Sequence, residues 1–256
     1  MSKIRIIPRL DIKNENLIKG IHLEGLRVIG NPNQFAKNYF ENGADEILYI
    51  DLVASLYRRS KLTSILKETV KDVFIPITVG GGIRNVSDVM DLLNSGADKV
   101  AINTSAVNNP KLIKNVSRTF GSQCMVLSVE AKKTTSNKWE VYTDCGRERT
   151  GLDVIDWIKY AEELGAGEIL LTSIDQEGTQ KGFDIDLISK VNETVSIPVI
   201  ASGGFGNFND LKNLLDNSKV SGCAIAHSLH YKKTSINKIK EECAKNSYEI
   251  RLDEKI

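Results

Sequence analysis

The stretch Ile75-Pro-Ile-Thr-Val-Gly-Gly-Gly82 recurs as Ile197-Pro-Val-Ile-Ala-Ser-Gly-Gly204, 122 residues further along the chain. A second pair of segments lies at the same spacing, because Gly43-Ala-Asp-Glu-Ile-Leu48 matches Gly165-Ala-Gly-Glu-Ile-Leu170. Matches that share one spacing indicate an internal duplication. We therefore expect the chain to consist of two copies of one structural unit.

Short β-branched runs alternate with longer stretches whose apolar residues recur three and four apart, the pattern of strands alternating with helices. The eight runs are Ile4–Leu10, Glu46–Leu52, Ile75–Val79, Lys99–Asn103, Met125–Glu130, Glu168–Ser173, Ile197–Ser202 and Gly222–Ala226. Helices are expected between them, for example over Asn33–Asn42, Val86–Asn94, Leu152–Leu164 and Asp184–Val191. Nearly apolar strands that each precede a helix pair in parallel and are buried on both faces. Eight such units in 256 residues predict one α/β domain over 1–256, a (β/α)8 TIM barrel made of two half-barrels. A doubly wound open sheet is the alternative, and the duplication favours the closed barrel.

Composition excludes several classes of protein. The 34 Lys+Arg and 33 Asp+Glu nearly cancel, which argues against a mainly electrostatic nucleic-acid binder. No apolar run approaches the ~20 residues that span a bilayer, and no signal peptide is recognised. The four cysteines are scattered without metal-ligand spacing. We expect a cytoplasmic protein with reduced thiols, no metal, and no nucleic-acid or membrane partner.

Two carboxylates are expected where the first and fifth strands end. The repeat aligns Leu10-Asp-Ile-Lys13 with Val129-Glu-Ala-Lys132, which makes Asp11 and Glu130 equivalent. The chemistry of these barrels lies at the carboxyl ends of the strands, so the two groups should face each other across the barrel mouth. Such a pair can divide general-acid and general-base roles if the environments separate their pKa values. The plainer alternative is that each carboxylate caps a loop or pairs with the lysine two residues on.

Glycines and helix starts repeat at the same rim. Gly80-Gly-Gly82 follows the third strand and Gly203-Gly204 the seventh, while Asn103-Thr104 and Ala226-His227 each precede a helix. Backbone N–H groups beside glycines and at helix starts hold phosphate, and a phosphate site at strands 7–8 is common in this fold. The two cradles predict an elongated substrate with a phosphate at each end. Tight turns alone are the alternative.

Two long loops follow the first and fifth strands. The loop over residues 12–31 is long enough for a lid and carries Lys19, for which an ordinary solvated lysine is the alternative. The loop over residues 131–150 is equally long, and its Trp139–Tyr142 segment suggests half of a small hairpin.

Four charged residues enter strands from the opposite, amino-terminal face. They are Arg5, Glu46, Lys99 and Glu168. We expect them to form a ring of two cations and two anions at the barrel bottom, and by themselves they suggest a structural salt-bridge plug. The three histidines have no metal-like partners in the sequence.

The quoted segments resemble a known family. Those that carry the resemblance are Arg5-Ile-Ile-Pro-Arg-Leu-Asp-Ile-Lys13, Leu17-Ile-Lys-Gly20, Val79-Gly-Gly-Gly-Ile-Arg84, Gly96-Ala-Asp-Lys-Val-Ala-Ile-Asn103, Phe120-Gly-Ser-Gln123, Gly165-Ala-Gly-Glu-Ile-Leu-Leu-Thr-Ser173 and Ile197-Pro-Val-Ile-Ala-Ser-Gly-Gly204. They occur in order between Arg5 and Tyr231. The chain resembles the cyclase subunit of imidazole glycerol phosphate synthase, a (β/α)8 barrel with two-fold symmetry.

The resemblance implies a reaction and a partner. Ammonia from a separate glutaminase subunit would travel through the barrel to a ribulosyl aminoimidazole ribonucleotide that carries two phosphates. Cleavage and ring closure would give imidazole glycerol phosphate for histidine synthesis and an aminoimidazole carboxamide ribotide for purine synthesis, without a cofactor.

The resemblance also assigns roles to residues. It makes Asp11 and Glu130 the essential carboxylates and Lys19 the lid lysine. Its phosphate-binding positions fall on Gly82, Asn103, Thr104, Thr172, Gly203, Gly204, Ala226 and His227. Its charged ammonia gate falls on Arg5, Glu46, Lys99 and Glu168.

Several positions depart from the family pattern. Glu130 replaces an aspartate, Arg9 a cysteine and His227 a serine, and Asp-x-Asp-Gly-Thr becomes Asp175-Gln-Glu-Gly-Thr179. The extra methylene moves a carboxylate by roughly 1.5 Å, and a misplacement of about 1 Å can cost about a hundredfold in rate. The departures suggest, as an alternative, a paralogous accessory subunit that channels ammonia to a sugar amidotransferase in surface-polysaccharide synthesis. A phosphosugar isomerase is a third hypothesis, which the gate residues argue against because an isomerase needs no nitrogen.

Overall fold

A computed structural model describes residues 3–54 and 62–251 of the chain. Eight parallel strands form the barrel: β1 (Arg5–Lys13), β4 (Ile47–Asp51), β5 (Ile77–Gly80), β6 (Lys99–Ile102), β7 (Met125–Thr135), β10 (Glu168–Ser173), β11 (Val199–Ser202) and β12 (Gly222–Ile225). Each strand pairs with the next in that order, and β12 pairs with β1. The pairing of β10 with β7 joins the two halves, so the sheet is closed. The predicted TIM barrel is confirmed, and the duplication stays a prediction.

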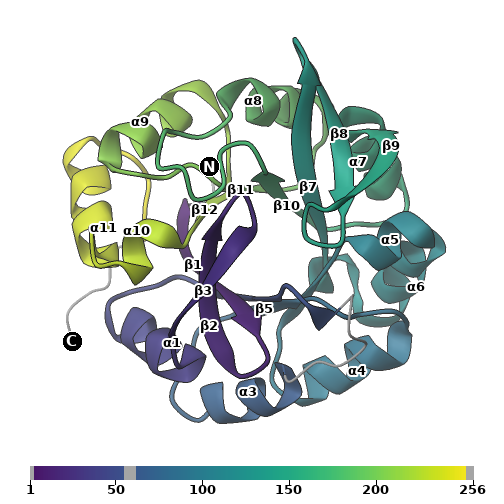
Figure 1. Cartoon of the computed structure of the whole chain (residues 1–256), viewed down its shortest axis with the longest axis horizontal. Helices are drawn as coiled ribbons and strands as arrows, with labels where there is room; N and C mark the ends of the chain where they lie inside the picture. Colours follow the sequence, from purple (N-terminus) through teal and green to yellow (C-terminus); the bar gives the residue numbers. More distant parts are fainter. Residues whose placement is uncertain (1–2, 55–61, 252–256) are drawn as a thin grey trace.

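Helices surround the strands as a ring (Figure 1). Their bounds are α1 (Pro32–Glu41), α3 (Leu62–Thr69), α4 (Val86–Asn94), α5 (Thr104–Asn108), α6 (Lys111–Phe120), α7 (Val154–Glu163), α8 (Ile185–Thr194), α9 (Phe208–Asn217), α10 (His227–His230) and α11 (Ile236–Lys245), with a 3-10 turn over Ser122–Cys124. Asn85 and Asn207 start α4 and α9 with the same reciprocal capping box, which satisfies backbone N–H groups that the helix leaves free.

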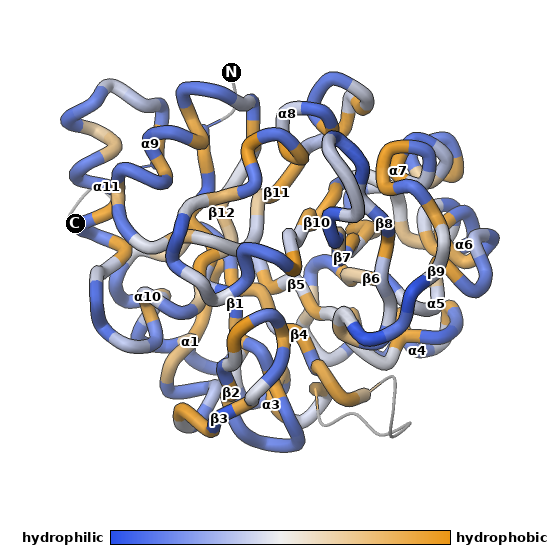
Figure 2. Tube along the Cα trace, turned by 45° about the horizontal axis from the view of Figure 1, so that its top comes forward, coloured by the Kyte–Doolittle hydropathy of each residue, from blue (hydrophilic) through white to orange (hydrophobic). Residues whose placement is uncertain are grey.

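The two faces of each barrel strand pack against different partners because successive side chains of a strand alternate. On β1, Ile6 and Leu10 belong to the outer core, which lies between the strands and the helices. Ile7 belongs to the inner cluster with Leu48 and Leu170. Figure 2 shows the corresponding mixture of hydrophilic and hydrophobic residues along the outer helices. Residues of β1 whose sequence position differs from that of Ile7 by an even number, such as Arg9, therefore also face the barrel interior.

Four antiparallel strands extend the barrel at its carboxyl-terminal face. β2 (Asn16–Ile21) and β3 (Glu24–Gly30) form a hairpin on the end of β1, where a loop was expected. In Figure 1 this hairpin lies in front of the barrel strands. β8 (Lys138–Thr143) and β9 (Glu148–Asp153) extend β7, which confirms the small hairpin suggested by Trp139–Tyr142.

Candidate functional site

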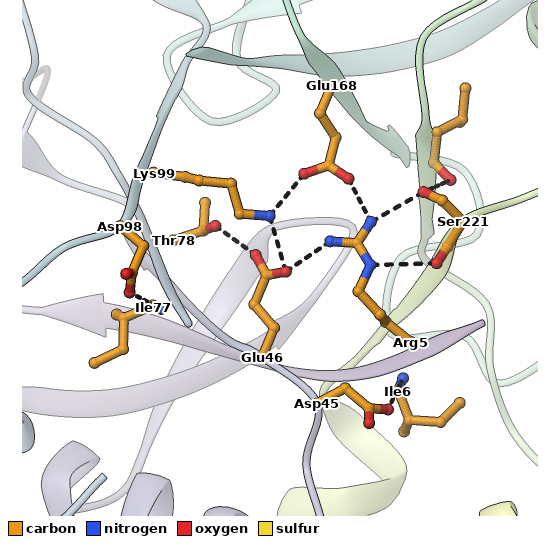
Figure 3. Close-up of polar contacts among 11 residues, drawn as sticks. Arg5, Ile6, Asp45, Glu46, Ile77, Thr78, Asp98, Lys99, Glu168 and Ser221 are labelled. Atoms are coloured by element: carbon orange, nitrogen blue, oxygen red, sulfur yellow. Dashed lines mark hydrogen bonds and ion pairs between the residues drawn. The ribbon is translucent and has the colours of Figure 1, made fainter. Parts of the chain in front are cut away.

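Four charged side chains form a closed ring at the amino-terminal end of the barrel, which we call the charge ring (Figure 3). Its members are Arg5, Glu46, Lys99 and Glu168. Arg5 Nη1 lies 2.7 Å from Glu46 Oε2, and its other terminal nitrogen contacts Glu168. Lys99 Nζ lies 2.9 Å from Glu46 and 2.8 Å from Glu168. The ring predicted from the sequence is therefore present, and its charges alternate.

Asp11 lies at the opposite end of the barrel interior and is 1% exposed. Its Oδ1 accepts a hydrogen bond from Arg9 Nε at 2.8 Å, and its Oδ2 lies 3.3 Å from Lys19 Nζ. Burial would raise the pKa of this carboxyl, but Arg9 and Lys19 outweigh burial and lower the pKa below its usual range. Asp11 is therefore held ionised, and it does not pair with Lys13 as the plainer alternative proposed.

Arg9 links Asp11 to the far side of the barrel. Its Nη1 donates to Thr172 Oγ1 at 2.9 Å and to Ser202 Oγ at 3.1 Å. Burial would lower the pKa of this guanidinium, but the carboxylates of Asp11 and Glu177 outweigh burial and raise it. Arg9 and Asp11 are two residues apart on one strand and so share the inner face. The two-residue spacing carried this signal, although Arg9 was predicted only as a departure from the family pattern.

Glu130 is buried on β7 in a different environment. Its Oε2 accepts hydrogen bonds from Asn103 Nδ2 at 3.0 Å and from the Gly146 N–H at 2.8 Å. Burial raises the pKa of Glu130 to about 7, against the opposing effect of the Arg9 charge. The two rim carboxylates thus have pKa values shifted in opposite directions, as a general-acid and general-base pair requires. Lys132 does not pair with Glu130, because its Nζ lies over the Tyr142 ring, 5.5 Å from the centroid.

A cavity of about 310 Å³ opens at the β5–β6 side of the rim. Gly82, Asn103, Thr104 and Glu130 line it together with neighbouring residues. Asn103 Oδ1 is buried there without a hydrogen-bond partner among the described residues. Gly82 has a φ of 73°, and a Cβ at this position would lie 2.8 Å from Ala54 Cβ, so the turn requires glycine. We call this cavity the open cradle.

The β11–β12 side of the rim is nearly filled. Gly203, Gly204, Ala226 and His227 line a cavity of only about 10 Å³, together with Arg9, Lys19 and Glu177. We call it the closed cradle. Lys19 and Glu177 form an ion pair in this lining, and Thr172 contacts Arg9. From the sequence, Glu177 was expected only as a departure in a motif, and this ion pair was not predicted.

No helix in 3–54 or 62–251 is long and apolar enough to cross a membrane. Within the same ranges, no group of three or more His, Cys, Asp or Glu residues is arranged to hold a metal ion.

Comparison with known proteins gives a family. Residues 5–235 match the family described as "Histidine biosynthesis protein". The "Imidazole glycerol phosphate synthase subunit HisF" of Legionella pneumophila is 63% identical over 210 residues, which cover 82% of this chain and 99% of that protein. The subunit of the same name from Prochlorococcus marinus (strain MIT 9515) is 47% identical over 257 residues, the full length of both chains. This chain belongs to the HisF family. HisF is a subunit of imidazole glycerol phosphate synthase, so the resemblance recognised in the sequence is confirmed. The Streptococcus mutans HisF subunit, 42% identical over 251 residues, also aligns along its whole length.

Proposed function

We propose that this chain is the cyclase of an imidazole glycerol phosphate synthase and uses ammonia supplied by a glutaminase subunit. The observation that carries the proposal is the arrangement along one barrel interior, with the charge ring at one end and two carboxylates of opposite pKa shift at the other. The substrate is the bisphosphorylated ribulosyl aminoimidazole ribonucleotide, and the products are imidazole glycerol phosphate and the aminoimidazole carboxamide ribotide.

The charge ring is the proposed point of ammonia entry. Its carboxylates accept hydrogen bonds from both cations, so a local exchange of partners can open the ring without leaving a buried charge unpaired. Above the ring lie apolar side chains that include Ile7, Leu48 and Leu170. A glutaminase that docks on this end would deliver ammonia directly into the barrel.

The two carboxylates take different parts in the proposed chemistry. Glu130, with a pKa of about 7, is suited to give and take a proton near neutral pH. Asp11 stays ionised beside Arg9 and Lys19, so it supplies a fixed negative charge and can accept a proton only as those partners move. Gly82, Asn103 and Thr104 hold one phosphate of the substrate, and Gly203, Gly204, Ala226 and His227 form the cradle for the other.

The setting proposed for this reaction is the cytoplasm. All four cysteines are free, which fits a reducing compartment.

The test of the proposed function needs no glutaminase. The purified chain should convert the bisphosphorylated substrate when ammonium salt is supplied at a pH above 8, where free NH3 is abundant. The Asp11→Asn variant, which keeps the volume and loses the charge, should give no product. A folded wild-type protein that forms no product would overturn the proposal.

The second candidate is an accessory subunit that channels ammonia to a sugar amidotransferase. A specific observation favours it: Arg9 donates hydrogen bonds to both Asp11 and Thr172, two of the residues that the family reaction uses. In a subunit of this kind, Asp11→Asn would not change ammonia delivery to the partner enzyme, whereas Lys99→Met in the charge ring would. The same two variants in both assays therefore separate the two functions.

A further inference from the structure

The turn after β10 places Glu177 inside the rim and holds it there from several sides. Its N–H donates to the Ser173 carbonyl at 3.0 Å, and its carbonyl accepts the N–H of His22 from the β2–β3 hairpin at 2.9 Å. A Cβ on Gly203 would lie 3.4 Å from Glu177 Cα, so the backbones are in close contact. The residue is 3% exposed. The backbone of Glu177 is therefore a fixed part of the closed cradle.

The side chain of Glu177 forms an ion pair with Lys19, the cation that would otherwise be available to a phosphate. Its Oε1 pairs with Lys19 Nζ, and both side chains are buried. Lys19 has Asp11 as its only other carboxylate partner among the described ion pairs, at 3.3 Å. Arg9 is the second cation of the cluster, and it is engaged with Asp11, Thr172 and Ser202. Two cations and two carboxylates thus compensate each other.

The two cradles also differ in the space available, and the closed cradle offers less of it. The closed cradle measures about 10 Å³, no more than the roughly 10–15 Å³ that a single water needs. The open cradle, at about 310 Å³, admits a phosphorylated group without rearrangement. Two cradles that the sequence repeat predicts to be equivalent therefore differ in the space they offer, and Lys19 and Glu177 line the smaller one.

We propose that Glu177 is a specificity-determining residue that competes with the second phosphate of a ligand for Lys19. The inference rests on the proposed function for the identity of the bisphosphorylated ligand. A phosphate at one end of a ligand binds in the open cradle. A phosphate at the other end binds only when the Glu177 carboxylate leaves Lys19, so the second phosphate adds less affinity than the first.

Glu177→Gln tests the competition because glutamine keeps the size and loses the charge. Calorimetry without ammonia measures the Kd of the bisphosphorylated substrate for the wild type, Glu177→Gln and the control Glu148→Gln, whose carboxylate is exposed on β9. Glu177→Gln should bind at least about tenfold more tightly, the scale of one hydrogen bond to a charged group. The control should stay within about twofold, since surface charges are screened. Adding Lys19→Met to Glu177→Gln should remove the gain, because the released cation is then absent.

Crystals soaked in inorganic phosphate locate the effect. The wild type should hold phosphate beside Gly82 and Asn103 only, whereas Glu177→Gln should hold phosphate in both cradles at the same concentration. Phosphate in both cradles of the wild type, an empty closed cradle in the variant, or an unchanged Kd would overturn the inference. If Glu177→Gln does not fold, Glu177→Met provides the same comparison. If Glu177→Gln binds the substrate more tightly but the wild type shows no turnover, only the proposed cyclase function is contradicted. If the wild type turns over but Glu177→Gln leaves the Kd unchanged, only this inference is contradicted.

Discussion

Replacing Arg9 with methionine removes a buried guanidinium and keeps most of the volume of the side chain. Among the described residues, Asp11 then retains Lys19 as its one ion-pair partner, at 3.3 Å, in place of the Arg9 contact at 2.8 Å. Removing one partner of a buried ion pair typically costs about 3–5 kcal/mol. Because the second cation remains, we expect the free energy of unfolding to fall by about 3 kcal/mol, the lower end of that range. Asp11→Asn should cost a similar amount, since it leaves Arg9 buried without its carboxylate.

The double variant measures the pair itself. If the two groups stabilise each other, Arg9→Met with Asp11→Asn should cost about 2 kcal/mol less than the sum of the single changes. The matched control is the exposed pair of Glu68 and Lys71, also at 2.8 Å, for which the coupling should be below about 1 kcal/mol. Urea unfolding at pH 8 gives all the free energies by linear extrapolation. Single changes at Arg9 and Asp11 that add to within about 0.5 kcal/mol would refute the reasoning.

Three further results are expected. Glu130→Asp should lower the ammonium-dependent kcat/KM by about 10- to 100-fold, because Asn103 and Gly146 already hold the longer carboxylate; a rate increase would contradict this. The raised pKa of Glu130, about 7, means that the folded state keeps a proton that the unfolded chain loses above its ordinary value of 4.5. The free energy of unfolding of the wild type, relative to that of Glu130→Gln, should therefore fall by about 3 kcal/mol between pH 4.5 and 7. Urea unfolding of the two proteins over this pH range measures the difference, and parallel curves would contradict the expectation. Lys99→Met should lower the glutamine-dependent rate about tenfold, because charge-assisted hydrogen bonds in the ring are lost. The ammonium-dependent rate should stay within about twofold. Equal losses in the two assays would show that the ring acts only on stability.

The barrel was predictable because its signals are local. The predicted runs Glu168–Ser173 and Val86–Asn94 coincide with β10 and α4 at both ends. Differences elsewhere have a simple cause: β5 and β11 start two residues later than predicted, directly after Pro76 and Pro198. Proline has no N–H to donate, so the hydrogen-bonded ladder begins at the residue that follows it.

The β2–β3 hairpin was missed because its turn lacks the usual glycine signal. His22 and Leu23 make the two-residue turn with φ angles of 52° and 63°, in the left-handed region that glycine and asparagine favour. Contacts with the turn after β10 hold this conformation, including the hydrogen bond from the His22 N–H to the Glu177 carbonyl. Local sequence could not report it, since the stabilising partner lies 155 residues away (from 22 to 177). The ion pair between Lys19 and Glu177 escaped prediction for the same reason.

The apolar layer above the charge ring favours molecules by their protonation state. The two cations and two carboxylates of the ring cancel, so the ring itself sets no net charge barrier. Ile7, Val126 and Ile200 above it offer a cation no group to replace its hydration shell, whereas an uncharged molecule of the same size does not meet this barrier. In the proposed cyclase, the amino-terminal half of the barrel would therefore admit ammonia and exclude ammonium, which differs from it by one proton. Ammonia would then reach the rim already deprotonated.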